Sequence, residues 1–207
     1  MENVFANEIK RFHSLNKIAN GNGTLLIGSS FMAAMPTGEF KQIYTVNKDL
    51  YNRSLEDLTI ASAKDIIELN VRELCPDRVL LQLGETDLER GFKNIPEMMA
   101  EYKSIIEMIR SIDKHIKIVL VSVCENEYKI QPAKFNLELE ALAHSTKCQY
   151  ADVTGCVTSD YPALKAFRSL RYFMTGSFSL CEAMDSLVLP ETKSTKLPLQ
   201  KAEPSLV

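Results

Sequence analysis

The sequence predicts an α/β protein with three layers, in which helices cover both faces of a parallel β-sheet. Short β-prone runs alternate along the chain with amphipathic stretches of about 15 residues, which is typical of βαβ units. The run at 78–83 is almost continuously apolar, as expected of a central strand that is covered on both sides. Five such strands predict the flavodoxin-like order 2-1-3-4-5.

The five strands are expected at residues 24–28, 40–46, 78–83, 117–123 and 149–153. The second is assigned from the alternating, β-prone pattern of Phe40 to Val46. Helices are expected over 2–19, from Ser30 to just before Pro36, and over 54–74, 95–112 and 132–147, with weaker helical patterns over 161–171 and 178–189. Residues 1–189 are therefore predicted to form a single domain, and 190–207, which hold three prolines and few large apolar side chains, a flexible tail.

The composition restricts the class of partner. A chain of 207 residues that is 45% hydrophobic can bury a full core, and a net charge of -3 gives no overall electrostatic preference for nucleic acid. Neither a leader pattern nor an apolar run of membrane-spanning length is found. The five cysteines are odd in number and never spaced C-x-x-C, which argues against disulfides or a zinc site. We expect a cytoplasmic protein with no nucleic-acid or membrane partner, no metal and no cofactor; assembly into a homo-oligomer is left open.

The stretch Thr24 to Met32 carries the clearest functional signal. A short apolar strand ends at Gly28, which allows a sharp turn, and two hydroxyls, Ser29 and Ser30, follow where a helix is expected to begin. Either serine could cap that helix. A side chain at the carboxyl end of a parallel strand also lies where open α/β sheets place their ligands, so a nucleophilic serine is the second interpretation.

The predicted topology brings two further segments to the same place. The ends of the first and third strands meet where the strand order reverses, which puts Ser29 and Ser30 close to residues 84–87, with 52–54 as a third neighbour. Hydroxyls and backbone N–H groups from three segments then converge on one crevice. An acyl-transfer site needs this arrangement: a nucleophile on a tight turn, and donors where an oxyanion would form.

Three short motifs resemble those of the SGNH (GDSL-like) hydrolases. Residues 25–32 (Leu-Leu-Ile-Gly-Ser-Ser-Phe-Met) resemble the first block of that family, where Gly-Asp-Ser follows the first strand. Residues 51–55 (Tyr-Asn-Arg-Ser-Leu) look like the second block, and 79–88 (Val-Leu-Leu-Gln-Leu-Gly-Glu-Thr-Asp-Leu) are close to the third, usually Gly-x-Asn-Asp. Their order and spacing agree over about residues 22–155. The resemblance implies the SGNH fold and a serine ester hydrolase, that is, a lipase, acylhydrolase or esterase.

The resemblance also implies roles for single residues. Ser30 matches the nucleophile, and its backbone N–H, the N–H of Ser54 and the side chain of Thr86 match the three donors of the oxyanion hole. The chain departs from the family at three of these positions: Ser29 replaces Asp, Ser54 replaces Gly and Thr86 replaces Asn. A threonine hydroxyl still donates, so a weakened oxyanion hole is expected.

The last block of the family, Asp-x-x-His before the final helix, is degenerate here. With 173–179 taken as the corresponding segment, Thr175 stands at the position of the Asp and Phe178 at that of the His. Neither can accept a proton at neutral pH. His115 and His144 are expected to face away from the crevice and the position of His13 is not fixed by the topology, whereas Glu85, Glu125 and Glu182 could lie nearer to it.

Three functions remain open. The first is an SGNH-type serine esterase or acylhydrolase acting on a small ester, with weak or lost activity. The second is a non-catalytic module on the same fold that binds a small acylated or sugar ligand or a protein partner. The third is an unrelated flavodoxin-like module that binds an anion or nucleotide at the loops after the first and third strands. The sequence leaves open whether the protein is an enzyme.

Overall fold

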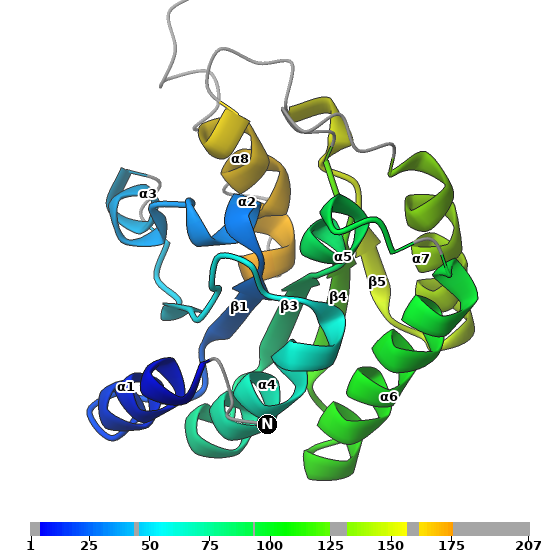
Figure 1. The fold of residues 1–207 in the computed structure, drawn as a ribbon. Coiled ribbons are helices and arrows are strands. Elements are labelled where there is room, and N and C mark those ends of the chain that lie inside the picture. The colour runs from blue at the N-terminus through cyan, green and yellow to red at the C-terminus, as the bar shows by residue number, and fades with distance from the viewer. Residues whose placement is uncertain (1–4, 44–45, 93, 125–131, 157–161, 176–207) are drawn as a thin grey trace, which may run out of the picture. The chain divides into compact units, whose positions relative to one another are not determined.

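A computed structural model describes residues 5–43, 46–92, 94–124, 132–156 and 162–175 (Figure 1). Its sheet contains β1 (Thr24–Gly28), β2 (Leu50–Asn52), β3 (Arg78–Gln82), β4 (Lys117–Val121) and β5 (Gln149–Ala151). The strands are parallel and lie in the order β2-β1-β3-β4-β5, as the sequence predicts. The described elements all belong to the unit Met1–Gly176. The predicted helix 178–189 and tail 190–207 lie outside the described residues.

Two apolar layers sandwich the sheet. Alternate residues of β1, β3 and β4, among them Leu25, Val79 and Ile118, pack against α1 (Ala6–Asn16), α4 (Ile60–Leu74), α6 (Ile95–Ile112) and α7 (Ala133–Ser145). The residues between them, such as Leu26 and Leu80, face α2 (Ser30–Ala33), α3 (Thr37–Ile43) and α8 (Pro162–Thr175). This alternation buries both faces of the sheet and makes the three layers.

The prediction of a strand over 40–46 is wrong. These residues belong largely to α3, where the Phe40 N–H donates to the carbonyl of Pro36 at 3.1 Å and the Phe40 ring packs against Phe167 of α8 at 5.0 Å between centroids. Apolar residues at 40, 43 and 46 fit a helical spacing as well as an alternating one, and helix packing decides between them. The edge strand is β2, which pairs Leu50 to Asn52 with β1.

The helix expected to begin near Ser54 begins at Ile60. The Thr59 hydroxyl accepts the Ser62 N–H at 3.2 Å and the Ser62 hydroxyl accepts the Thr59 N–H at 3.0 Å, a reciprocal cap that fixes the first turn. The short helix α5 (Glu85–Glu89) follows β3, and a 3₁₀ turn, η1 (Thr154–Cys156), follows β5. In the described part of the chain no helix is both long and apolar enough to cross a bilayer.

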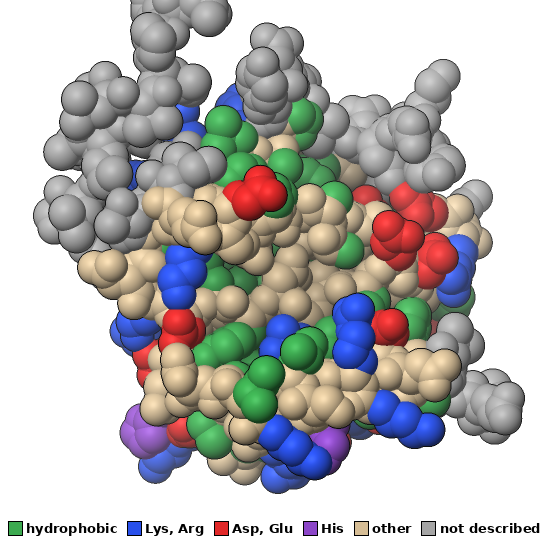
Figure 2. All heavy atoms as spheres, turned by 90° about the vertical axis from the view of Figure 1, so that its left-hand side faces the viewer, with side chains coloured by type: hydrophobic (Ala, Val, Ile, Leu, Met, Phe, Trp, Pro, Cys, Tyr) green, Lys and Arg blue, Asp and Glu red, His purple; other side chains and the backbone are tan. Residues whose placement is uncertain are grey.

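Charged side chains of both signs are interspersed over the face that carries α1, α3 and β2 (Figure 2). The histidines visible on this face lie at its lower edge, at the end of the molecule where the strands begin (Figure 2). The opposite edge, where the strands end, carries α2 and α5 (Figure 1).

Candidate active site

The turn after β1 is built by a close approach of two strands. A Cβ at Gly28 would stand 2.6 Å from the Cβ of Met32 and 2.7 Å from the carbonyl oxygen of Gln82, so only glycine fits without a shift. The Ser29 N–H donates to the same carbonyl at 3.2 Å, and α2 begins at the next residue. Ser30 therefore lies at the carboxyl edge of the sheet, as the sequence predicts.

The two serines of this turn differ in environment. Ser29 is fully buried, and its side chain makes no capping hydrogen bond to α2. Ser30 is partly exposed, and within the described residues its hydroxyl has no hydrogen-bond partner. Of the two serines, only Ser30 is therefore available to a ligand. Ser29 occupies the N-cap position of α2, but its hydroxyl does not cap the helix.

The Glu85 carboxylate is the hydrogen-bond partner of the Ser29 hydroxyl. Its Oε2 atom accepts the hydrogen bond from Ser29 Oγ at 3.1 Å and a second from the Phe31 N–H at 3.2 Å, and the residue is only 6% exposed. The resemblance puts an Asp at the position of Ser29, whereas here the carboxylate at this turn comes from the third motif. The sequence indicated only that Glu85 could lie near the crevice.

The second segment reaches the site through main-chain pairing. The Arg53 N–H donates to the carbonyl of Leu26 at 2.8 Å and the Leu55 N–H to that of Gly28 at 3.1 Å, which brings Ser54 alongside the turn. The Ser54 N–H, the expected oxyanion donor, already donates to Asn52 Oδ1 at 3.1 Å. The Ser54 hydroxyl is buried and has no hydrogen-bond partner among the described residues.

Arg53 holds this segment against α1. Its guanidinium donates to Asn16 Oδ1 at 3.3 and 3.1 Å and lies over the Phe12 ring at 5.4 Å. Burial lowers the pKa of Arg53, because the cation loses hydration. Arg53 thus positions the loop, and its charged end is directed at α1 rather than at Ser30.

The third segment turns at Gly84, which has φ of 106° and is packed against the Phe135 ring so closely that a Cβ would overlap it. This conformation starts α5 directly after β3 and places Glu85, Thr86 and Asp87 in buried positions. Thr86 is 1% exposed, and its hydroxyl has no hydrogen-bond partner among the described residues. A buried hydroxyl without a partner costs about 1–3 kcal/mol, so Thr86 and Ser54 each carry an unsatisfied donor beneath the surface of this edge.

Asp87 ties this segment to α4. Its Oδ2 accepts the Ile60 N–H, the first free donor of that helix, at 3.1 Å. Burial raises the pKa of the Asp87 carboxyl, and the hydrogen bond from Ile60 opposes this in part. Asp87 therefore has a structural contact and does not face Ser30 as a free base.

The three histidines of the chain all lie in its described part, and none is near Ser30. His13 pairs with Glu73 at the end of α4, His115 stands before the start of β4, and His144 lies 4.0 Å from Glu140 on α7. The ends of these helices and the start of β4 are at the edge of the sheet opposite to α2. A histidine base for Ser30 is thereby excluded.

Thr175, which the resemblance implies as a site position, lies at the amino edge of the sheet, away from Ser30. It ends α8, where its hydroxyl donates to the Arg171 carbonyl at 3.0 Å, and the carbonyl of the preceding Met174 accepts the Thr24 hydroxyl at 2.8 Å. Thr24 is the first residue of β1, whereas Ser30 lies two residues beyond the last, Gly28, which separates the two by roughly 15–20 Å. The reason is that α8 runs antiparallel to the strands, so only its start reaches the carboxyl edge. Phe178, Glu125 and Glu182 lie outside the described residues.

Other reactive groups near the carboxyl edge are already engaged. The Cys124 thiol is buried, donates to the carbonyl of Val153 at 3.3 Å, and has its pKa raised to about 12 by burial and then by the nearby Cys156 and Glu85. Burial acts to raise the pKa of Asp152, but hydrogen bonds from Thr154 and Ser122 outweigh it and the pKa is lowered. Within the described ranges, no three His, Cys, Asp or Glu side chains converge to hold a metal ion.

Comparison with known proteins places this arrangement in a known fold. No family model and no curated protein matches the sequence. Among solved structures, a protein from Streptococcus pneumonia described provisionally as a platelet activating factor superposes with a TM-score of 0.67 at 16% identity, over 81% of this chain and 91% of that one. A psychrotrophic esterase, EstA, from Pseudoalteromonas sp., solved with monoethylphosphonate as inhibitor, gives 0.57 at 14% identity, over 73% and 98%. A GDSL-like lipase from Bacteroides thetaiotaomicron gives 0.56 at 18% identity, over 70% and 77%.

The chain therefore has the fold of the SGNH (GDSL-like) hydrolases, which confirms the fold that the three motifs imply. At sequence identities of 14–18% the similarity shows the fold alone.

Proposed function

We propose that this chain is an SGNH-type serine ester hydrolase by descent, which binds a small ester or acylated ligand at Ser30 and whose turnover is weak or lost. The observation that carries the proposal is the composition of the site. Hydroxyls from Ser30, Ser54 and Thr86 are gathered at one edge of the sheet, whereas all three histidines lie elsewhere.

Binding is supported by the donors that are still free. The Ser30 N–H lies at the start of α2, and the hydroxyls of Thr86 and Ser54 lack partners among the described residues. A carbonyl or ether oxygen of a ligand at Ser30 reaches the buried hydroxyls of Thr86 and Ser54 only when the side chains that cover them move, and each hydrogen bond made there recovers a desolvation cost that the free protein carries. The site therefore favours an oxygen-rich, uncharged ligand such as an ester or an acylated sugar.

Slow turnover follows from two features. A serine hydroxyl without a base is a poor nucleophile, and removing the histidine of a serine hydrolase triad costs about 10⁶-fold in turnover. The Glu85 carboxylate accepts the N–H of Phe31, the residue next to Ser30, and a fixed negative charge there would oppose the charge of a developing oxyanion. Glu85 cannot replace the base through Ser29, because Ser29 is fully buried and meets no substrate.

The proposal also includes the cellular compartment, which we infer from the cysteines. The four cysteines in described positions, Cys75, Cys124, Cys148 and Cys156, are free thiols. Free thiols, one of them exposed, suit a reducing cytosol, and we place the protein there.

Ester hydrolysis and active-site labelling test the proposal. We expect slow turnover of p-nitrophenyl acetate and slow labelling by a fluorophosphonate, both lost in Ser30→Ala and both retained in Ser14→Ala, a matched change on the exposed side of α1. Added imidazole should accelerate acylation of the native protein and leave Ser30→Ala unchanged, since it supplies the missing base.

Two outcomes would redirect the assignment. Equal labelling of native protein and Ser30→Ala would remove Ser30 as nucleophile. If neither reaction depends on Ser30 and imidazole has no effect, the second interpretation stands in its place: a non-catalytic module that binds a small acylated or sugar ligand or a protein.

A further inference from the structure

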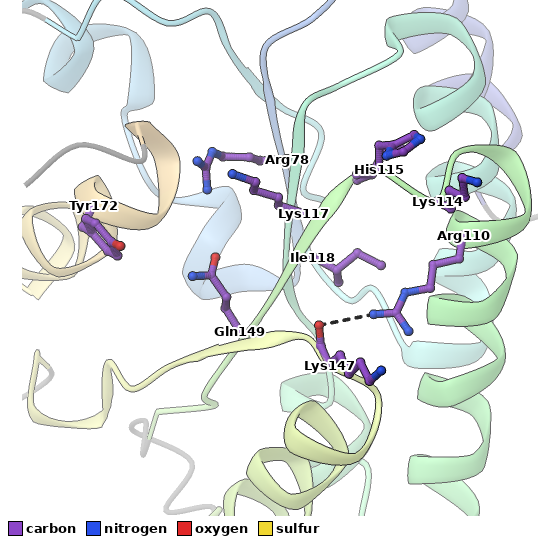
Figure 3. Close-up of a pocket in the computed structure, with 10 residues that line it drawn as sticks. Arg78, Arg110, Lys114, His115, Lys117, Ile118, Lys147, Gln149 and Tyr172 are labelled. Carbon is purple, nitrogen blue, oxygen red and sulfur yellow. Dashed lines mark hydrogen bonds between the residues drawn. The ribbon is translucent and has the colours of Figure 1, made fainter.

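A cavity lies at the amino edge of the sheet, at the opposite end of the strands from Ser30. Its volume is about 440 Å³, which falls within the range of small-molecule sites. Basic side chains dominate its lining: Arg78, Arg110, Lys114, His115, Lys117 and Lys147 (Figure 3). On a chain with net charge -3, this is a local concentration of positive charge.

The strand register gathers one half of this cluster. Arg78 of β3 and Lys117 of β4 are Cα partners, so their side chains leave the same face of the sheet. Figure 3 shows these two side chains beside each other, with Gln149 of β5 and Tyr172 of α8 on the same side of the cavity. This half combines two cations with two polar groups that can accept or donate hydrogen bonds.

The other half comes from the loops that lead into β4 and β5. Lys114 and His115 precede β4, Arg110 is in the last turn of α6, and Lys147 stands between α7 and β5. Ile118 lies between the two halves (Figure 3). The cavity thus has one set of cations on each side of Ile118: Arg78 and Lys117 on one side, and Arg110, Lys114 and Lys147 on the other (Figure 3).

These cations are not neutralised by facing carboxylates. Within the described residues, Arg78, Lys114, Lys117 and Lys147 form no ion pair, and Arg110 donates to the Lys147 carbonyl at 3.4 Å and to Cys148 Sγ at 3.6 Å. Two acids, Asp77 and Asp113, line a neighbouring recess and not this cavity.

Asp77 pairs with Lys48, and Asp113 Oδ1 accepts the His115 N–H at 2.8 Å. The cations therefore repel one another in this cavity, and a bound anion would relieve the repulsion.

The kind of anion follows from the geometry. Arginine forks and lysine ammonium groups together are the usual partners of phosphate oxygens. Two separated sets of cations fit two phosphate groups better than one, and a volume of about 440 Å³ suits a small molecule. The neighbouring recess, of about 370 Å³, shares Arg78, His115 and Lys117 but adds Lys48 together with Asp77 and Asp113, so the unbalanced positive charge belongs to the first cavity.

We propose that this amino-edge cavity, in which β3, β4, the end of α6 and the loops before β4 and β5 place five cations with no facing carboxylate among the described residues, binds a small molecule that carries two or more phosphate groups. The site is separate from Ser30 and does not depend on the function proposed for it.

Calorimetric titration of the full chain with inorganic pyrophosphate, tripolyphosphate and orthophosphate tests this at low and at moderate chloride concentration. Pyrophosphate and tripolyphosphate should bind at one site, at least tenfold more tightly than orthophosphate, and less tightly as chloride increases. Arg78→Gln/Lys117→Gln should weaken binding at least tenfold. Lys64→Gln/Lys134→Gln, which removes the same charge from exposed positions of α4 and α7, should change it less than twofold.

Three results would overturn the proposal: no pyrophosphate binding by the folded native protein, equal weakening in both double variants, or tighter binding to a short oligonucleotide or to vesicles containing a phosphoinositide than to either polyphosphate. Circular dichroism of each variant establishes that it is folded. Lys114→Gln alone, at an exposed loop position, provides a milder change that is expected to weaken binding about threefold.

Discussion

Ser29 Oγ donates a hydrogen bond to Glu85 Oε2 at 3.1 Å, and this buried contact joins the turn after β1 to the turn after β3. The same oxygen accepts the N–H of Phe31, so one carboxylate fixes the first turn of α2 from the neighbouring strand end. The position of Ser30 depends on this contact, although Ser30 does not take part in it.

Replacing Glu85 should destabilise the protein. In Glu85→Ala, the Ser29 hydroxyl and the Phe31 N–H lose their acceptor, and we expect the free energy of unfolding to fall by about 2–3 kcal/mol in urea. Glu85→Gln keeps one acceptor and should cost less. Glu140→Ala, at an exposed site 4.0 Å from His144, is the control and should cost under about 0.5 kcal/mol. Equal losses at both positions would show that the Ser29–Glu85 contact contributes nothing specific.

Gly84 should tolerate no side chain. Gly84→Ala puts a Cβ into the Phe135 ring at a φ of 106°, so steric overlap adds to backbone strain, and we expect a loss of at least about 3 kcal/mol by urea denaturation. Gly91 also has a positive φ, 80°, but open space around it, so Gly91→Ala should cost about 1 kcal/mol. Phe135→Leu in combination with Gly84→Ala should recover part of the loss; if it recovers none, overlap with the ring is not the cause.

Asp87 should make stability depend on pH. Burial raises its folded-state pKa above the ordinary 3.8, so the folded state binds the proton more tightly, and its contribution to stability decreases as pH rises from 3.8 through the raised pKa. Asp87→Asn removes this loss and keeps an oxygen for the Ile60 N–H. We expect the variant to be more stable than the native protein at pH 7, and to differ from it less at pH 4, measured by urea unfolding. A variant that is less stable at pH 7 would mean that the ionised carboxylate is net stabilising there.

The thiols should react in the order of their exposure. Cys75 is exposed, whereas Cys124 is buried with its pKa raised to about 12, so at pH 8 almost none of it is thiolate. Iodoacetamide followed by peptide mass mapping should find Cys75 modified within minutes and Cys124 unmodified until the protein is unfolded in urea. Modification of Cys124 at a rate similar to that of Cys75 in the folded protein would contradict its burial.

Much of the fold could be predicted from local patterns. The apolar runs at 24–28, 78–83 and 117–123 and the amphipathic stretch at 95–112 lie where the structure has β1, β3, β4 and α6. These elements are buried on a full face or on both faces, so the periodicity of their apolar residues is strong. The strand order 2-1-3-4-5 followed from that alternation and is confirmed.

Elements whose apolar spacing fits both a helix and a strand could not be predicted from the sequence. Residues 40–46 suit a helix or an edge strand, and the contact of Phe40 with Phe167 of α8 selects the helix. The start of α4 at Ile60 depends on a cap at Thr59 and on a hydrogen bond to Asp87 from another turn. The Phe40–Phe167 contact and the Ile60–Asp87 hydrogen bond join residues far apart in sequence, which local propensity cannot represent.

By itself the sequence determined the three-layer α/β fold and the meeting of Ser30, Ser54 and Thr86 segments at one edge, because strand periodicity and parallel connections leave few arrangements open. Only the tertiary structure decided that Glu85 binds Ser29, that Thr175 lies at the opposite edge, and that Arg78 and Lys117 share a cavity with three other cations. These relationships depend on strand register, on helix direction and on the distance between side chains, which arise only when separate segments pack together.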